Sequence, residues 1–81
     1  MQRKDRVSSV VGQVLYAARE RLKLTQEELA ARAKMDRSYI SDIERGGASL
    51  SVERLLRICQ AMKIPAADVI SQIEDALRRG T

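Results

Sequence analysis

The 81-residue chain has no histidine, tryptophan or phenylalanine, and it contains only two tyrosines, one proline and one cysteine. Without histidine, and with Cys59 as its single thiol, the chain lacks the usual ligands of zinc and the pair of cysteines that a disulfide needs. Two aromatic rings are too few for the stacking surfaces that bind single-stranded nucleic acid. We therefore expect no metal site, no cofactor and no single-stranded nucleic-acid partner.

Long apolar runs and catalytic groupings are also missing. No segment approaches the roughly 18 uninterrupted apolar residues of a membrane span, and no signal-peptide core follows the charged start. We expect a cytoplasmic protein without a membrane partner. The adjacent Glu27 and Glu28 point about 100° apart on a helix, which suits helix capping better than acid–base catalysis. Because there is also no glycine-rich phosphate loop and no nucleophile–base pair, we expect no enzymatic activity.

The size and charge of the chain limit the number of domains it can form and the kinds of partner it can bind. A chain of 81 residues has room for one small domain. Its 15 lysines and arginines exceed its 11 acidic residues and give a formal net charge of +4, which permits a polyanionic partner without requiring one. If the partner is a nucleic acid, it should be duplex DNA read by side-chain hydrogen bonds and charge.

Apolar residues recur at intervals of three and four, which predicts helices, and β-branched residues do not alternate as they would in strands. Thr25 and Glu28 match a capping box, Asp36 and Ser51 suit helix N-caps, and Pro65 suits a helix start. The expected helices cover residues 8–22, 26–33, 37–45, 52–62 and 65–79. The fold class is therefore all-α, with a basic N-terminal arm over residues 1–7 and a single domain over residues 8–81.

The second and third expected helices are short and are separated by only three residues. Such a connection forces a steep crossing, as in a helix-turn-helix over about residues 26–45. At about 100° per residue, Tyr39, Ile40 and Ile43 fall on one side of the third helix and Glu44 lies at the boundary. The other side carries only polar side chains: Arg37, Ser38, Ser41, Asp42 and Arg45. Such side chains contact base edges and phosphates in a major groove.

Residues 25–30 (TQEELA) and 38–46 (SYISDIERG) resemble the XRE family of phage repressor and Cro-type DNA-binding domains. The resemblance implies a five-helix, lambda-repressor-like domain in which Gln26 holds a phosphate and braces the recognition helix. It also implies an ion pair between Arg19 and Glu44, and a buried apolar pair at Ile40 and Ile43. The implied DNA-binding residues are Gln26, Arg37, Ser38, Ser41 and Asp42, and the periodicity of the third helix adds Arg45 to this predicted DNA-binding set.

The chain departs from the family pattern at three places where relatives often have glycine. Lys23 stands after the first helix, Lys34 stands in the turn of the helix-turn-helix, and Lys63 stands after the fourth helix. If their backbones are left-handed, each lysine costs on the order of 1 kcal/mol relative to glycine. A cation at a helix C-terminus returns about 0.3–1 kcal/mol through the helix dipole.

The resemblance implies a sequence-specific transcriptional regulator that binds double-stranded DNA. We expect a small stand-alone repressor, a restriction–modification controller or an antitoxin; the sequence does not choose among them, and a toxin as protein partner stays open. The alternative is a helical protein–protein interaction module that uses the same scaffold without DNA binding. Asp42 favours that alternative, because a carboxylate accepts few base contacts beyond a cytosine amino group. The combination of Gln26, Arg37 and Arg45 favours DNA.

One recognition helix reads too few base pairs for a unique genomic address, so we expect a homodimer on half-sites about 34 Å apart. The fifth helix carries an apolar stripe, and we predict Ile73 and Leu77 as the dimer interface. The alternative is that both residues pack against the first helix. On the fourth helix, the predicted apolar stripe consists of Val52, Leu55, Leu56, Cys59 and Met62.

Overall fold

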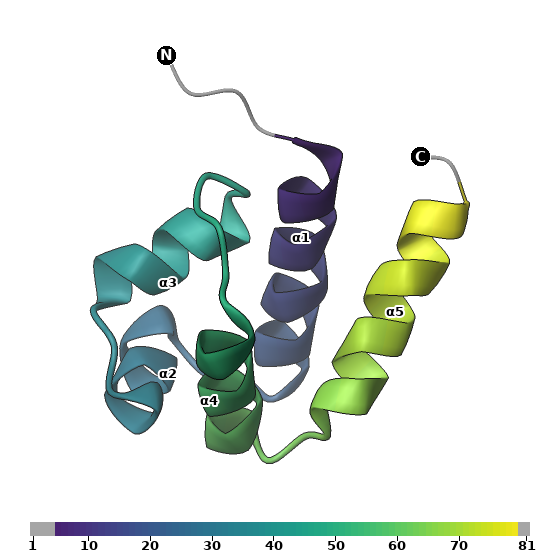
Figure 1. The fold of residues 1–81 in the computed structure, drawn as a ribbon. Helices are drawn as coiled ribbons and strands as arrows, with labels where there is room; N and C mark the ends of the chain where they lie inside the picture. The colour runs from purple at the N-terminus through teal and green to yellow at the C-terminus, as the bar shows by residue number, and fades with distance from the viewer. Residues whose placement is uncertain (1–4, 80–81) are drawn as a thin grey trace.

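The computed structural model describes residues 5–79, and this part of the chain forms five α-helices without a strand (Figure 1). The helices are α1 (Arg6–Arg21), α2 (Gln26–Ala33), α3 (Arg37–Glu44), α4 (Val52–Met62) and α5 (Ala66–Arg78). In the described part of the chain, no helix has the length and hydropathy to cross a bilayer. The expected all-α, five-helix fold is confirmed.

The helix boundaries lie within two residues of the predicted ones, and the largest difference is at the start of α1. The carboxylate of Asp5 accepts a 2.7 Å hydrogen bond from the backbone N–H of Ser8 and caps the helix. Helix α1 therefore begins at Arg6, so that Arg6 and Val7 belong to the helix and not to the basic arm expected over residues 1–7. Residues 1–4 of that arm lie outside the described residues.

The start of α2 has the predicted capping box. Thr25 Oγ1 accepts a 3.0 Å hydrogen bond from the backbone N–H of Glu28, and the Glu28 carboxylate accepts a 2.8 Å bond from the backbone N–H of Thr25. These hydrogen bonds lower the pKa of Glu28. The bond from the Thr25 backbone has the largest effect, and the bond with the Thr25 side chain has the second largest. Asp36 occupies the N-cap position of α3 as predicted, but its side chain makes no capping hydrogen bond.

The three lysines that replace family glycines all have left-handed backbones. The φ angles of Lys23, Lys34 and Lys63 are 57°, 58° and 58°. Lys34 and Lys63 are the C-caps of α2 and α4, where the amide N–H groups of each turn bond back to the helix. The tight turns are therefore built at three positions where a side chain costs on the order of 1 kcal/mol.

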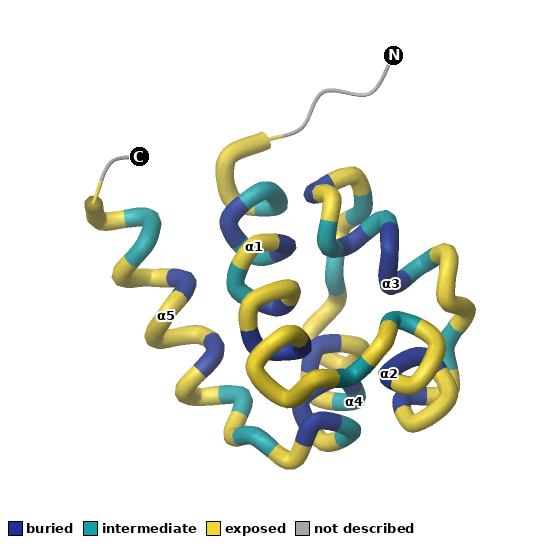
Figure 2. The backbone as a smooth tube through the Cα atoms, turned by 180° about the vertical axis from the view of Figure 1, so that it is seen from behind, coloured by how far each residue is buried: buried dark blue, intermediate teal, exposed yellow. Residues whose placement is uncertain are grey.

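The core lies between α1 and the other helices, with α3 and α5 against α1, and α2 against α3 and α4 (Figure 2). Burial raises the pKa of the Cys59 thiol. Helix α1 lies close to the end of α3 at Gly12, where a Cβ atom would lie 2.3 Å from the backbone oxygen of Ile43 and 2.7 Å from that of Glu44. The largest fully buried side chains are Leu15, Leu29, Ile40, Ile43, Ile58, Val69 and Cys59.

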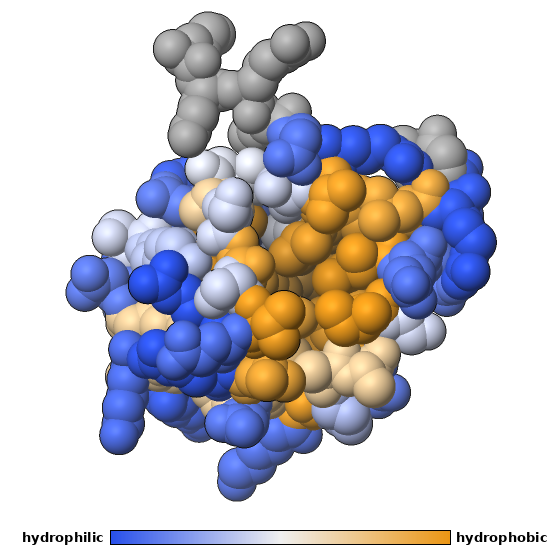
Figure 3. All heavy atoms as spheres, viewed as in Figure 1, coloured by the Kyte–Doolittle hydropathy of each residue, from blue (hydrophilic) through white to orange (hydrophobic). Residues whose placement is uncertain are grey.

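Two apolar stripes differ from the sequence prediction. On α4, Val52 is 72% exposed and Leu56 is 44% exposed, and Ile58 lies in the core instead. The reason is that α2 and α5 both pack on α4 and cover the face centred on its residues 55, 58, 59 and 62. Figure 3 shows the resulting apolar surface on the side of the molecule seen in Figure 1.

On α5, the structure follows the alternative to the predicted dimer interface. Ile73 is buried and Leu77 is half-buried, because α5 lies alongside α1 and turns this stripe into the core. A hydrogen bond from the Arg6 guanidinium to the Leu77 carbonyl joins the start of α1 to the end of α5. Ile73 is therefore not part of an exposed stripe, and the assignment of Ile73 and Leu77 to a dimer interface stays a prediction.

Candidate nucleic-acid interface

Helices α2 and α3 form the expected helix-turn-helix. The backbone N–H of Met35 donates to the carbonyl of Ala30 at 2.9 Å, which closes the end of α2 within the three-residue turn. Ala30 is buried where the helices meet, and Ile40 and Ile43 are buried beneath α3. This packing fixes the side of α3 that faces solvent.

Four side chains from three helices form a continuous chain of hydrogen bonds behind α3. The Arg19 guanidinium donates to both carboxylate oxygens of Glu44, with Nε–Oε2 at 2.6 Å and Nη2–Oε1 at 2.9 Å. The Gln26 amide donates to Glu44 Oε1 at 3.0 Å. Gln26 Oε1 in turn accepts from Arg37 Nη1 at 3.2 Å. The chain therefore connects the buried Arg19 to the exposed Arg37.

The inner half of this chain is desolvated. The side chains of Arg19 and Glu44 are 7% and 6% exposed. The hydrogen bond to Glu44 raises the pKa of Arg19 against the opposing effect of burial. Arg19 Nη1 also donates to the Leu24 carbonyl at 2.7 Å, and no buried side-chain N or O atom among residues 5–79 lacks a hydrogen-bond partner. The pair thus fixes the end of α3 against α1.

The outer half of the chain positions Arg37 in the first turn of α3. Its side chain is half exposed, and its Nε lies 3.9 Å from a carboxylate oxygen of Glu27. Gln26 and Glu27, at the start of α2, therefore both contact the Arg37 guanidinium. Ser38, the next residue of α3, is exposed. These positions are at the N-terminal end of α3, the end that enters a major groove in helix-turn-helix proteins.

The C-terminal half of α3 has a second polar group. The Arg45 guanidinium donates to the Ser41 hydroxyl and to the Asp42 carboxylate. Ser41 is buried, which differs from its predicted place on the outer face, and its hydroxyl accepts a hydrogen bond from the Arg45 guanidinium. The Asp42 side chain is half exposed and the Arg45 side chain is exposed. Of the predicted DNA-binding side chains of α3 and its C-cap, Ser41 alone is therefore buried.

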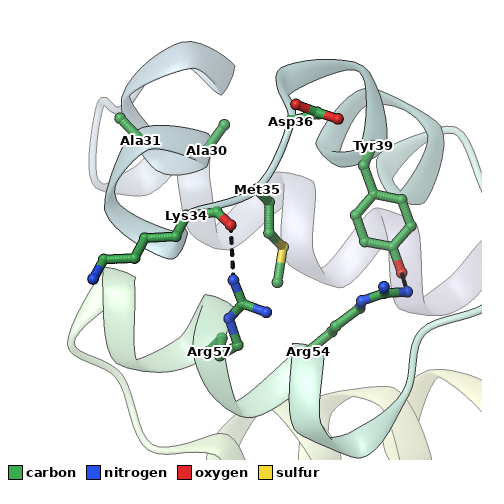
Figure 4. A pocket seen from close by; sticks show the side chains of 8 residues that line it. All are labelled: Ala30, Ala31, Lys34, Met35, Asp36, Tyr39, Arg54 and Arg57. Atoms are coloured by element: carbon green, nitrogen blue, oxygen red, sulfur yellow. Dashed lines mark hydrogen bonds between the residues drawn. The ribbon is translucent and has the colours of Figure 1, made fainter.

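Two cationic side chains beside α3 were not among the residues predicted from the sequence. Arg54 lies with its guanidinium 5.0 Å from the Tyr39 ring centroid and donates to the Tyr39 hydroxyl at 3.3 Å. Arg57 donates to the carbonyls of Ala33 and Lys34 at 2.9 and 2.7 Å. Both line a surface pocket of about 550 Å³ beside the turn (Figure 4). The signal available in the sequence is their spacing of three residues on the polar face of the fourth helix.

Comparison with known proteins identifies the family of this chain. The family model described as Helix-turn-helix matches residues 15–69, which include both helices of the motif. The transcriptional regulator ClgR of Mycobacterium tuberculosis (strain ATCC 25618 / H37Rv) is 36% identical over 73 residues, which are 90% of this chain and 65% of ClgR. The immunity repressor protein of Bacillus phage phi105 is 37% identical over 62 residues, which are 76% of this chain and 43% of the repressor. The chain thus spans less than two thirds of either relative.

A solved structure agrees with the sequence relatives. The restriction–modification controller protein C.Esp1396I, in a tetramer in complex with its natural 35 base-pair operator, matches with a TM-score of 0.81 and 28% identity. The match covers 88% of this chain and 93% of that chain. These relatives are regulators and not enzymes. The resemblance to the XRE family is confirmed: the chain belongs to the helix-turn-helix family.

Proposed function

We propose that the chain is a sequence-specific transcriptional regulator that acts in the cytoplasm and binds duplex DNA as a homodimer, with one α3 in each of two major grooves. The observation that carries this proposal is the connection of the exposed Arg37 through Gln26 to the buried Arg19–Glu44 pair. A side chain that is oriented before binding loses less conformational entropy when it contacts a base. The arrangement therefore favours base reading over a merely solvated helix face.

Each polar side chain of the interface has its own expected role. The planar fork of Arg37 suits O6 and N7 of guanine, and the Ser38 hydroxyl, Asp42 and Arg45 complete the contacts to bases and phosphates. Within the described residues, the Gln26 amide nitrogen donates one hydrogen bond, to Glu44. Its second N–H is directed by the same geometry and suits a phosphate oxygen at the start of α2. Gln26 thus braces Arg37 and fixes the register on the DNA backbone.

The proposed dimer follows from the length of sequence that one helix can read. A single recognition helix contacts only a few base pairs, which does not distinguish a site among 10⁶ or more competitors. Two copies on half-sites about 34 Å apart double the sequence read. The operator complex of C.Esp1396I supports such an assembly, since that relative binds its operator as a tetramer.

Selection from a pool of random duplexes tests the proposal. We expect an enriched sequence with two inverted half-sites centred about ten base pairs apart. The affinity for that sequence should fall steeply with salt, with a log–log slope of about 0.9 per neutralised phosphate. Failure to enrich any duplex, or an affinity that is independent of salt, would contradict DNA binding and support the interaction-module alternative.

A further inference from the structure

The guanidinium of Arg37 is held by two residues at the start of α2. Gln26 Oε1 accepts a hydrogen bond from Arg37 Nη1 at 3.2 Å, and a carboxylate oxygen of Glu27 lies 3.9 Å from Arg37 Nε. The second contact is an ion pair, because its distance is too long for a hydrogen bond. The side chains of Arg37 and Glu27 are 50% and 73% exposed. The arginine that reads a base in the proposed function therefore has a counter-charge on the same surface.

Helix capping is the role of Glu28 and does not account for the position of Glu27. The Glu28 carboxylate accepts the hydrogen bond from the backbone N–H of Thr25 that completes the capping box. Within residues 5–79, the Glu27 side chain makes no hydrogen bond to the start of α2. A carboxylate in the first turn also stabilises the helix dipole, but this effect does not require a contact with Arg37. The feature that distinguishes Glu27 from Glu28 is therefore its ion pair.

The two contacts leave one edge of the Arg37 guanidinium available for a base. Glu27 lies beside Nε, and Gln26 accepts from Nη1. In the part of the chain that the structure describes, Nη2 forms no hydrogen bond, so its two N–H groups and the second N–H of Nη1 remain. N–H groups on these neighbouring nitrogens match O6 and N7 of guanine. A phosphate that approaches the guanidinium is repelled by the Glu27 carboxylate, whereas a neutral base is not.

A second exposed arginine of this surface also has a counter-charge. The Arg45 guanidinium donates to the Asp42 carboxylate, and their side chains are 63% and 50% exposed. The Arg37–Glu27 and Arg45–Asp42 pairs together carry no net charge, so the formal excess of four positive charges lies outside them. Non-specific binding to duplex DNA depends on positive charges that neutralise phosphates. The two arginine pairs therefore contribute little to non-specific affinity.

We propose that Glu27 is a positioning residue that determines specificity, because it directs Arg37 to a base and prevents this arginine from neutralising a phosphate. The inference rests on the proposed binding of duplex DNA through α3. Specificity is a difference between two affinities, so a repulsive group that weakens binding to unrelated sequences raises it as a new contact does. Glu27 lies outside the predicted DNA-binding set because it acts through Arg37 and contacts no base.

The experiment compares Glu27→Gln with Glu74→Gln in the full-length chain. Glutamine keeps the size of the side chain and removes its charge. Glu74 is an exposed residue of α5, and α1 lies between α5 and α3 (Figure 1). Glu74→Gln therefore makes the same change in net charge away from the recognition helix.

The probes are the duplex enriched from the random pool, its single-base variants and an unrelated duplex of equal length. Fluorescence anisotropy at several salt concentrations measures the affinities, and circular dichroism measures helicity. The Nε–Hε resonance of Arg37 in the free protein reports the ion pair by nuclear magnetic resonance without DNA.

We expect Glu27→Gln to bind the unrelated duplex about three- to fivefold more tightly than the wild type, the upper range for an exposed ion pair. Its log–log salt slope should increase by about 0.9, as for one more neutralised phosphate. The preference at the base pair that Arg37 reads should fall by a similar factor, and the preferences at other base pairs should not change. Addition of Glu27→Gln to Arg37→Ala should cause no further loss of preference, because the two residues act as a unit. The Arg37 Nε–Hε resonance should shift in Glu27→Gln and stay in place in Glu74→Gln.

The role of Glu27 would be overturned by an equal loss of preference at every base pair, or by equal effects of Glu74→Gln. An Arg37 resonance that does not respond to Glu27→Gln would show that the ion pair is absent in solution and would also contradict the proposal. If Glu27→Gln lowers helicity and leaves the preference intact, Glu27 serves the helix dipole alone. A wild type that binds no duplex contradicts the proposed function, whereas a wild type that selects a duplex while Glu27→Gln keeps the full preference contradicts the role of Glu27 alone.

Discussion

Arg19 on α1 and Glu44 at the end of α3 form a bidentate ion pair, with hydrogen bonds of 2.6 Å from Nε to Oε2 and 2.9 Å from Nη2 to Oε1. Both side chains are almost fully buried. Because Glu44 also accepts a hydrogen bond from Gln26, the same carboxylate fixes α3 against both α1 and the start of α2. The pair is therefore a structural element of the helix-turn-helix as well as the inner end of the chain that reaches Arg37.

Removal of Glu44 should strongly destabilise the protein. Glu44→Ala leaves the buried Arg19 guanidinium without its partner, which typically costs about 3–5 kcal/mol in the free energy of unfolding. Urea denaturation measures this change. Glu20→Ala is the control, because the Glu20 carboxylate is 3.5 Å from Arg19 but 54% exposed, and an exposed pair contributes less than about 1 kcal/mol. Equal losses for the two variants would show that burial of the pair has little effect.

The close approach of α1 and α3 at Gly12 leads us to a second prediction, which concerns the stability of the fold. A methyl group at Gly12 would collide with the backbone oxygens of Ile43 and Glu44, whereas one at Gly47 would lie 3.7 Å from the nearest backbone oxygen. We expect Gly12→Ala to destabilise by about 1–3 kcal/mol, as overpacking does, and Gly47→Ala to leave the melting temperature nearly unchanged. Thermal denaturation of the two variants distinguishes these cases. A Gly12→Ala protein as stable as the wild type would place α1 farther from α3.

The features that could be predicted from the sequence are those that local chemistry decides. The capping box of Thr25 and Glu28 needs only neighbouring residues, and the left-handed backbone of Lys34 lies where relatives often have glycine. The burial of Ile40 and Ile43 follows from helical periodicity and from the family pattern. The helix-turn-helix is mostly local in this sense, so the sequence contains most of the information for it.

The features that were missed depend on which helices pack on one another. Periodicity groups Val52 and Leu56 with the other apolar residues of α4, but α2 and α5 cover a different part of that helix. The contact between α1 and α5 likewise buries Ile73, which periodicity alone left on an exposed stripe. The burial of Ser41, and the hydrogen bond that Arg45 donates to it, likewise depend on packing that no sequence pattern specifies.

The roles of Arg37 and Gln26 separate in binding measurements on the selected duplex and its point variants. Arg37→Ala should cost about 1–3 kcal/mol at one base pair and remove the preference there. Gln26→Ala should weaken all sequences, since it removes a phosphate contact and the brace on Arg37. Fluorescence anisotropy across single-base variants measures both patterns. If Arg37→Ala weakens every duplex equally, Arg37 contacts phosphate and does not read a base.

The capping box at the start of α2 makes stability depend on pH. Hydrogen bonds from Thr25 lower the pKa of Glu28 in the folded state. A carboxyl group with a depressed pKa stabilises the fold above its unfolded-state pKa, and this contribution is lost as the pH falls through the folded-state pKa. Glu28→Gln should therefore be less stable than the wild type at neutral pH and should approach it in acid. The control is Glu53→Gln in the first turn of α4, which removes a similar charge without a capping box. Urea titrations at several pH values measure the difference, and a Glu28→Gln effect that stays constant down to acid pH would contradict the role of the carboxylate.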